Sequence, residues 1–211
     1  HVGGGFMYTN KQSISLGLVA TISDLVTAEV SLCQMMEDFK DHPAVAPLIM
    51  DGKVVEHSGH MVPEGGLNMM PELIGDGVIL AGESAMKCIN LGYMVRGIDY
   101  AIAAGMHAGQ TAAAAIAAGD TSKDGLAPYI DALENSFVLK DLRRFSKFPH
   151  FMESTTRIFN EYPALARDVL NSLFIVDGEP VKPLRQSVMP LVKRVGIMNV
   201  LKDVRGGMKA L

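Results

Sequence analysis

The chain has no tryptophan and only two cysteines among its 211 residues. So few cysteines exclude a disulfide scaffold, favour a reducing compartment and cannot ligate a four-iron cluster, which takes four thiols. No uncharged apolar run reaches the roughly 18 residues of a transmembrane helix, since the most apolar stretch, residues 94–118, carries Arg96, Asp99 and His107. The net charge of −4 excludes a strongly basic nucleic-acid-binding protein.

A second absence concerns dinucleotide binding. The spacing Gly-x-Gly-x-x-Gly, which holds a pyrophosphate in a βαβ unit, does not occur. Gly3-Gly4-Gly5 continues into Phe6-Met7-Tyr8, and Gly75-Asp76-Gly77 continues into Val78-Ile79-Leu80. The sequence therefore lacks a Rossmann phosphate-binding turn.

The most informative run that is present covers residues 75–99. A turn leads into the short apolar run 78–81, typical of a buried strand, which ends at Gly82-Glu83. A glycine-spaced loop follows, and an alanine-rich helix is expected over 94–118. A carboxylate accepts hydrogen bonds from hydroxyls, glycine lets backbone approach a flat ligand, and a helix start offers free N–H groups. These features suit a ligand that joins a polyol to an electron-poor ring.

This run resembles the second flavin-binding motif of the glutathione-reductase-type flavoproteins, in the branch of the geranylgeranyl reductases and hydroxybenzoate-hydroxylase-like enzymes. The whole chain, from Gly3 to its basic tail, is similar to the C-terminal half of FixC-type flavoproteins, relatives of the electron transfer flavoprotein–quinone oxidoreductases. Further matching stretches are 36–49 and 98–105. We therefore interpret the chain, which begins at His1 in strand-like sequence, as a fragment that does not bind FAD tightly alone.

The resemblance implies a mixed α+β or α/β fold, the C-terminal part of a glutathione-reductase-type FAD fold without its N-terminal βαβ unit. Residues 1–64 would be the returning part of a sheet domain that contacts quinone or substrate. Residues 65–120 would complete the FAD-binding domain, and residues 121–211 would form a helical cap with a basic tail.

The hydrophobic pattern predicts the local elements. Strands are expected at 6–9, 13–23, 53–62 and 78–82, and helices over 27–40, 94–118 and most of the chain beyond 121, with breaks at Pro149, Pro163, Asp177-Gly178 and Pro183. Because strand 78–82 would lack sheet neighbours, we expect an exposed edge, which a second copy of the chain would cover.

The resemblance assigns FAD binding to eight loop residues: Gly82, Glu83, Asn90, Leu91, Gly92, Met94, Val95 and Arg96. Glu83 stands where the family usually has an aspartate that accepts hydrogen bonds from the ribityl hydroxyls; the alternative is an acid that caps the loop. Met86 would add bulk beside the isoalloxazine. The backbone N–H groups of five residues would face the pyrimidine edge: Gly92, Met94, Val95, Arg96 and Gly97. Arg96 would stabilise reduced flavin, unless it is a surface residue of the first helical turn.

Neither a catalytic side chain nor a metal site is expected. Cys88 lies in the same loop, but no second cysteine makes a C-x-x-C pair, so we interpret it as a packing residue. His57 and His60 would point to opposite faces of the expected strand, which argues against a shared metal. Electron transfer needs proximity and tuned potentials rather than a nucleophile or an acid–base pair.

Two enzyme hypotheses follow from the resemblance. The first is an FAD-dependent oxidoreductase that takes electrons from an electron transfer flavoprotein, with a ferredoxin-like subunit as a further carrier, and passes them to a quinone. The alternative is an isoprenoid double-bond reductase of the geranylgeranyl reductase type. The apolar stretch Leu67-Asn68-Met69-Met70-Pro71 suits either a quinone site or a lipid tunnel.

A third hypothesis is a docking module formed by the tail. Residues 179–211 carry seven bases and two acids, a net charge of +5, and the bases are separated by apolar residues as in an amphipathic helix. Such a tail favours contact with an anionic membrane surface or an acidic partner, although a solvated face on a packed helix has the same pattern. The expected location is cytoplasmic, peripheral at the inner face of the membrane, without nucleic acid.

Overall fold

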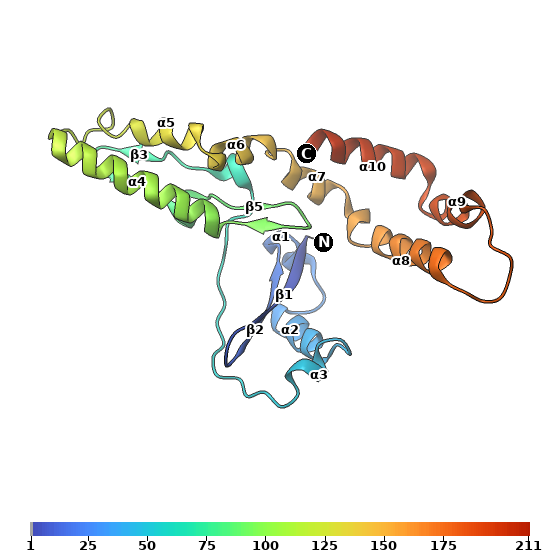
Figure 1. The fold of residues 1–211 in the computed structure, drawn as a ribbon. Coiled ribbons are helices and arrows are strands. Elements are labelled where there is room, and N and C mark those ends of the chain that lie inside the picture. The colour runs from blue at the N-terminus through green and yellow to red at the C-terminus, as the bar shows by residue number, and fades with distance from the viewer. Residues whose placement is uncertain (1) are drawn as a thin grey trace. The chain divides into compact units, whose positions relative to one another are not determined.

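The computed structural model describes residues 2–211 and combines helices with short antiparallel hairpins, which confirms the mixed α+β class (Figure 1). The chain forms two compact units. One is His1–His60 with Thr156–Pro163, and the other is Met61–Thr155 with Ala164–Leu211. Among the described residues, no helix combines the length and the apolar character that a membrane span requires.

The first unit is built on a hairpin of two seven-residue strands, β1 (Gly3–Thr9) and β2 (Ile14–Ala20), paired along their whole length. Asn10 fixes the turn, because its backbone N–H donates to the Ser13 carbonyl at 2.9 Å and its side-chain amide donates to the hydroxyls of Ser13 and Ser15. The two strands predicted at 6–9 and from residue 13 are therefore confirmed, and they pair as a hairpin.

Three short helices complete this unit: α1 (Ile22–Thr27), α2 (Leu32–Asp41) and α3 (Ala46–Ile49). The predicted strand 13–23 is wrong at its end, since α1 already begins at Ile22. The predicted helix 27–40 is wrong at its start. Helix α2 begins only after Ser31, whose hydroxyl accepts the N–H of Gln34 as an N-cap at 3.2 Å.

The third predicted strand, 53–62, is also wrong, because this segment has no regular secondary structure. Val54 and Val55 are 72% and 85% exposed, so neither alternate side of the segment is buried. An alternating pattern becomes a strand only where a neighbouring strand satisfies its backbone, and none pairs with it in the described part of the chain.

The second unit begins with two minimal hairpins, in which β3 (Ile74–Gly75) pairs with β4 (Val78–Ile79) and β5 (Ile89–Asn90) pairs with β6 (Val95–Arg96). The predicted strand 78–82 is too long, because Gly82 has a positive φ of 69° and begins the 3₁₀ turn η2 (Gly82–Ala85). The expectation that this strand would lack sheet neighbours is wrong on one side, because β3 pairs with it; on its other side no strand of the described residues pairs with β4.

Helix α4 (Ile98–Ala118) is the longest element and follows these hairpins. Its predicted start at Met94 is wrong. Val95 and Arg96 form strand β6, which pairs with β5, and Gly97 is the N-cap of the helix. Its end is as predicted, at Gly119 with a positive φ of 73°. Its apolar residues lie on all sides, a pattern typical of a helix that is buried.

The remainder is helical, as predicted: α5 (Pro128–Asn135), α6 (Phe137–Arg144), α7 (Phe148–Ser154), the 3₁₀ helix η3 (Thr156–Ile158), α8 (Glu161–Phe174), α9 (Leu184–Val195) and α10 (Ile197–Ala210). A short 3₁₀ turn, η1 (Gly66–Met69), precedes the hairpins. Pro149 and Pro163 lie within the first turns of α7 and α8 rather than at breaks, which a missing N–H permits there. Asp177-Gly178 lies in the connection between α8 and α9, and Pro183 is the N-cap of α9.

In the second unit, α4 packs against α5 and α6 (Figure 1). Tyr100 of α4, Tyr129 and Leu133 of α5, and Leu142 of α6 are essentially fully buried there. This cluster supports the loop from η2 to β6, which contains all eight residues assigned to FAD.

Candidate functional site

The loop of residues 82–97 is folded against the N-terminal turns of α4. A Cβ atom built on Gly82 would lie 3.7 Å from the Cβ of Ala101, and one built on Gly97 would lie 3.6 Å from the sulfur of Cys88. The structure thus brings the eight predicted residues together in one loop at one end of a helix.

Glu83 lies on η2 and its side chain is exposed. The negative charge of Glu83 acts electrostatically on the thiol of Cys88, which lies in the middle of the loop. Burial, followed by the negative charges of Glu64 and Glu83, raises the pKa of the Cys88 thiol above its ordinary value. A thiol with a raised pKa is protonated at neutral pH, which agrees with a packing residue rather than a nucleophile.

Asn90 organises the turn between β5 and β6. Its side-chain amide donates to the carboxylate of Glu64, and its side-chain oxygen accepts the backbone N–H of Gly92 at 2.8 Å. The N–H of Leu91 donates to the carbonyl of Met94 at 2.9 Å. The N–H groups of Leu91 and Gly92 are therefore engaged within the loop, and Gly92 permits its shape with a φ of 77°.

Arg96 is the most highly connected side chain of the loop. Its Nε donates to Asp99 at 2.8 Å, a terminal nitrogen donates to Asp99 at 2.5 Å, and the other terminal nitrogen donates to Asp141 of α6 at 2.6 Å. The guanidinium carbon lies 4.6 Å from the ring centre of Tyr100 and 5.6 Å from that of Phe137. Arg96 therefore joins β6, the first turn of α4 and α6.

Arg96 and the side chains around it form what we call the Arg96 cluster: Arg96, Asp99, Tyr100, Phe137 and Asp141. Its guanidinium does not act as a free cation, because two carboxylates bind it, and the hydroxyl of Tyr100 donates to Asp141 at 3.3 Å. Burial raises the pKa of Tyr100, so it stays neutral near physiological pH. The cluster carries a formal charge of −1 and orients the loop.

A buried lysine in the same loop was not singled out from the sequence. Lys87 is 1% exposed, its Nζ lies 3.3 Å from the hydroxyl oxygen of Tyr129, and that hydroxyl donates to the Leu80 carbonyl at 2.9 Å. Burial lowers the pKa of Lys87 to about 8 and raises the pKa of Tyr129 to about 12. No local pattern distinguishes this lysine from a surface one, because its burial depends on α5, some 40 positions further along the chain.

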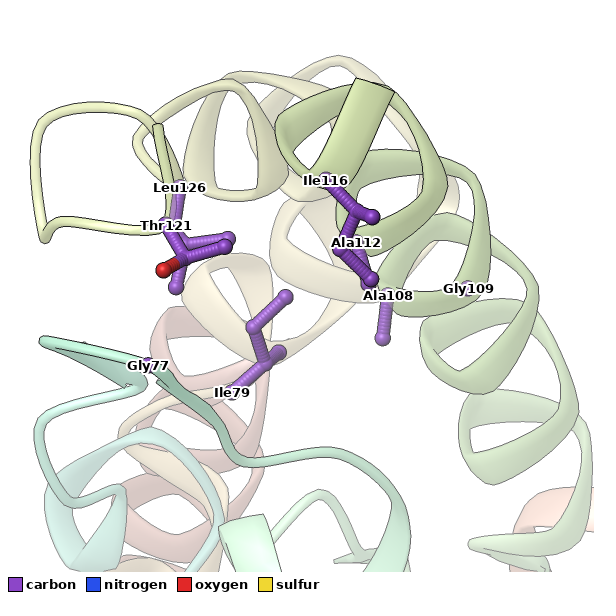
Figure 2. Close-up of a pocket in the computed structure, with 8 residues that line it drawn as sticks. All are labelled: Gly77, Ile79, Ala108, Gly109, Ala112, Ile116, Thr121 and Leu126. Carbon is purple, nitrogen blue, oxygen red and sulfur yellow. The ribbon is translucent and has the colours of Figure 1, made fainter. Parts of the chain in front are cut away.

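An apolar hollow of the described surface lies elsewhere. It has a volume of about 340 Å³, between α4 and the β3–β4 hairpin, and Figure 2 shows Ile79, Ala112, Ile116 and Leu126 around it. Thr121 is its one polar side chain, and none of the eight predicted residues lines it. This hollow can accept apolar groups but offers no chemistry. Among residues 2–211, no group of three or more His, Cys, Asp or Glu side chains is arranged to hold a metal ion.

What the loop offers a ligand is a short set of donors and acceptors. The first intrahelical bond of α4 joins the Ala101 N–H to the Gly97 carbonyl at 2.8 Å, which leaves the three preceding N–H groups without an intrahelical acceptor. Glu83 of η2 supplies an exposed carboxylate near this end of α4. Because Gly82 has no side chain, the backbone next to Glu83 is not covered by one. The carboxylate can accept hydrogen bonds from the hydroxyls of a polyol, and the N–H groups at the helix start can donate to the electron-rich edge of a ring.

Comparisons with known proteins give the relatives of this chain. Residues 148–211, which include α7 and α10, match the ETF-QO/FixC family C-terminal domain. The chain is 48% identical to the probable electron transfer flavoprotein-quinone oxidoreductase YdiS of Escherichia coli K12 over 210 residues, which are 100% of this chain and 49% of that protein. Protein FixC of the same strain has the same identity and coverage.

The chain is of the FixC type. A further relative, the probable electron transfer flavoprotein-quinone oxidoreductase YgcN of Escherichia coli K12, is 35% identical over 99% of this chain and 49% of its own length. The FixC-type chain thus spans about half the length of the curated relatives that it matches.

The Arg96 cluster gives a prediction about stability. Replacing Arg96→Met leaves Asp99 and Asp141 close together without their cation. We expect the free energy of unfolding to fall by about 2–3 kcal/mol, because charged hydrogen bonds are lost and two acids are left facing each other. Urea unfolding followed by circular dichroism measures it. The control is Arg143→Met, which breaks the exposed pair with Glu134 and costs under about 1 kcal/mol. Equal losses in both variants would contradict the assignment.

Lys87 gives a prediction about pH. Because its pKa is about 8 in the folded chain and 10.5 ordinarily, the unfolded chain holds more protons between these values, and stability rises with pH there. From pH ~7.5 to ~9.5 the contribution of Lys87 grows by about 2 kcal/mol.

Urea unfolding at those two pH values, compared with the variant Lys87→Met, isolates this contribution. Lys87→Met is expected to lose this increase in the free energy of unfolding between the two pH values. Lys140→Met, which removes an exposed lysine, is expected to keep it. A pH dependence that is the same in the wild type and in Lys87→Met would show that the lysine is not held in a low-dielectric site.

Proposed function

We propose that this chain is part of an FAD-dependent oxidoreductase that passes electrons from an electron transfer flavoprotein to a quinone, with a ferredoxin-like subunit as a further carrier. The observation that carries the proposal is the continuous 48% identity over the whole chain to a protein named as a probable electron transfer flavoprotein-quinone oxidoreductase. That similarity includes the loop 82–97 and is not confined to the C-terminal domain match.

The residues of the loop fit FAD as the cofactor. Glu83 would accept hydrogen bonds from the ribityl hydroxyls, and Gly82 would let the backbone approach the ligand. The open N–H groups at the start of α4 would face the electron-rich edge of the ring. When bound, FAD supplies the capacity to accept electrons from one carrier and release them to another.

The other predicted residues have supporting roles in this proposal. Asn90, Leu91 and Gly92 would hold the turn that faces the ring, and Met94 and Val95 would shape its rim. Arg96 would act as a positioning residue, because its guanidinium is bound to Asp99 and Asp141.

The exposed apolar surface of α4 supports the idea that this chain is completed by further protein. Ile98, Ile102, Met106 and Ile116 are between 54% and 81% exposed on a helix of largely apolar residues. We propose that the glutathione-reductase-type fold covers this surface in the longer protein. In this proposal residues 1–64 belong to the sheet domain, 65–120 to the FAD-binding domain and 121–211 to the helical cap. The protein would be cytoplasmic and touch the inner face of the membrane through its basic tail.

Flavin binding tests the proposal. A polypeptide of the relatives' full length that contains this sequence is expected to purify with FAD, visible as the yellow absorbance of bound flavin and identified after release by heat. Glu83→Ala is expected to raise the dissociation constant for FAD about ten- to a hundredfold, because a charged hydrogen-bond acceptor is lost. Glu83→Asp restores the carboxylate that the family commonly has there.

The matched control is Glu29→Ala, which removes an exposed acid from the first unit. A wild-type polypeptide without flavin affinity would contradict the proposed function. Flavin binding that Glu83→Ala weakens no more than Glu29→Ala does would keep the function and remove Glu83 from the site.

A further inference from the structure

Lys87 occupies an unusual place for a charged side chain. It follows Met86, which has a φ of 56° and is the one non-glycine residue with a positive φ among residues 2–211. The side chain of Lys87 is 1% exposed, its Nζ donates to the hydroxyl of Tyr129 at 3.3 Å, and Nζ lies 5.6 Å from the centre of that ring. Lysine is seldom fully buried without a paired charge, and here its hydrogen-bond acceptor is a neutral hydroxyl.

The surroundings of Lys87 join it to both parts of the loop that are assigned to FAD. A Cβ atom built on Gly97, the N-cap of α4, would lie 3.9 Å from the carbonyl oxygen of Lys87. Tyr129, which accepts from the amine, donates to the carbonyl of Leu80 at 2.9 Å, two residues before Gly82. Lys87 therefore contacts the helix start directly, and Tyr129 links it to the segment that leads into Gly82 and Glu83.

The charges near Lys87 leave it available to bind a proton. Arg96 is already bound by two carboxylates, so its charge is balanced. Burial lowers the pKa of Lys87 to about 8, and burial raises the pKa of Tyr129 to about 12, so the tyrosine stays neutral while the lysine titrates. The neighbouring elements bring these titratable or charged groups to this part of the unit: Tyr129 from α5, Glu64 from before η1, Glu83 and Cys88 from the loop, and Arg96, Asp99 and Tyr100 at the start of α4.

We propose that Lys87 takes up a proton at Nζ when the flavin bound in the loop of residues 82–97 is reduced, and returns it when the flavin is reoxidised. The inference deepens the proposed function and rests on it, because it requires flavin in this loop. A buried neutral amine becomes more basic when a negative charge develops nearby, and the effect is strong where water is excluded. The resulting ammonium would stabilise the reduced flavin, which the balanced charge of Arg96 does not do.

The proton count follows from the charges. Two electrons, supplied in the proposed function by the reduced electron transfer flavoprotein, enter the flavin with one proton and leave one excess negative charge on it. Where Lys87 begins as the neutral amine, Nζ binds one further proton from water and becomes an ammonium. When both electrons pass to the acceptor, both protons return to water. Above pH ~8, Lys87 thus raises the uptake from one proton to two for each pair of electrons.

The pH dependence of the flavin reduction potential tests this inference. The FAD-loaded polypeptide of the relatives' full length is titrated with dithionite in the presence of redox dyes, at pH values from ~7 to ~10. Each proton taken up with two electrons contributes about 30 mV per pH unit to the slope of the potential. We expect the slope to steepen from about 30 toward about 60 mV per pH unit above pH ~8, where the oxidised protein holds the neutral amine.

Four variants assign the second proton. Lys87→Met is expected to keep the shallow slope throughout, because it has no amine to protonate. Lys140→Met removes an exposed lysine and Cys88→Ser removes the neighbouring thiol, and both are expected to retain the steep region. Tyr129→Phe keeps the buried amine but removes its acceptor, so the ammonium is less stable and the steep region is expected to begin at lower pH.

The outcomes separate this inference from the proposed function. Flavin content, measured after release by heat, is determined before each titration. A wild-type polypeptide that binds FAD but keeps the shallow slope at every pH would overturn the role of Lys87 and leave the proposed function standing. A steep region that persists in Lys87→Met would also overturn it, because another group would then bind the second proton.

Two further results bear on the same question. A wild-type polypeptide that does not bind FAD would remove the proposed function and this inference together. If Lys87→Met fails to fold or to bind FAD, the wild type and Tyr129→Phe still decide, because a steep region with the same onset in both would contradict a proton held at Lys87 Nζ.

Discussion

The loop assigned to FAD depends on one guanidinium. Arg96 binds Asp99 in the first turn of α4 and Asp141 on α6, and it lies over the ring of Tyr100. These contacts fix the end of β6, which in turn fixes the Asn90 turn and the position at which α4 begins. The same contacts neutralise the arginine, so the positive charge that the loop offers a ligand comes from the helix start rather than from this side chain.

Local patterns predicted those elements whose partners lie nearby in the sequence. The β1–β2 hairpin, the end of α4 at Gly119 and the helical character beyond residue 121 were all predicted, because turn residues and helix periodicity act over a few positions. The predicted strand 53–62 is wrong, since no strand among the described residues pairs with it. The predicted start of α4 is wrong, since Val95 and Arg96 pair with β5 and Arg96 binds Asp141 far along the chain. The burial of Lys87 under Tyr129 has the same origin in long-range packing.

Several surfaces of this chain are apolar and exposed in ways that differ physically. On α4, isoleucines and a methionine stand on a helix of small residues with few charges, as expected for a helix buried in a larger protein. On α10, the exposed Leu201, Val204 and Met208 lie next to the exposed bases Lys202, Arg205 and Lys209. The hollow between α4 and the β3–β4 hairpin has no titratable group. In the loop at the start of α4, by contrast, carboxylates, a thiol and a buried lysine lie within one short segment.

The most direct test of an electron-transferring flavoprotein is a turnover measurement on the longer polypeptide that contains this sequence. It would be mixed with a reduced electron transfer flavoprotein and a short-chain quinone, and quinone reduction would be followed by absorbance. The expected result is quinone reduction that requires both the polypeptide with its flavin and the electron transfer flavoprotein. Saturation of an isoprenoid double bond, with the quinone left oxidised, would contradict the proposed function and favour a lipid reductase.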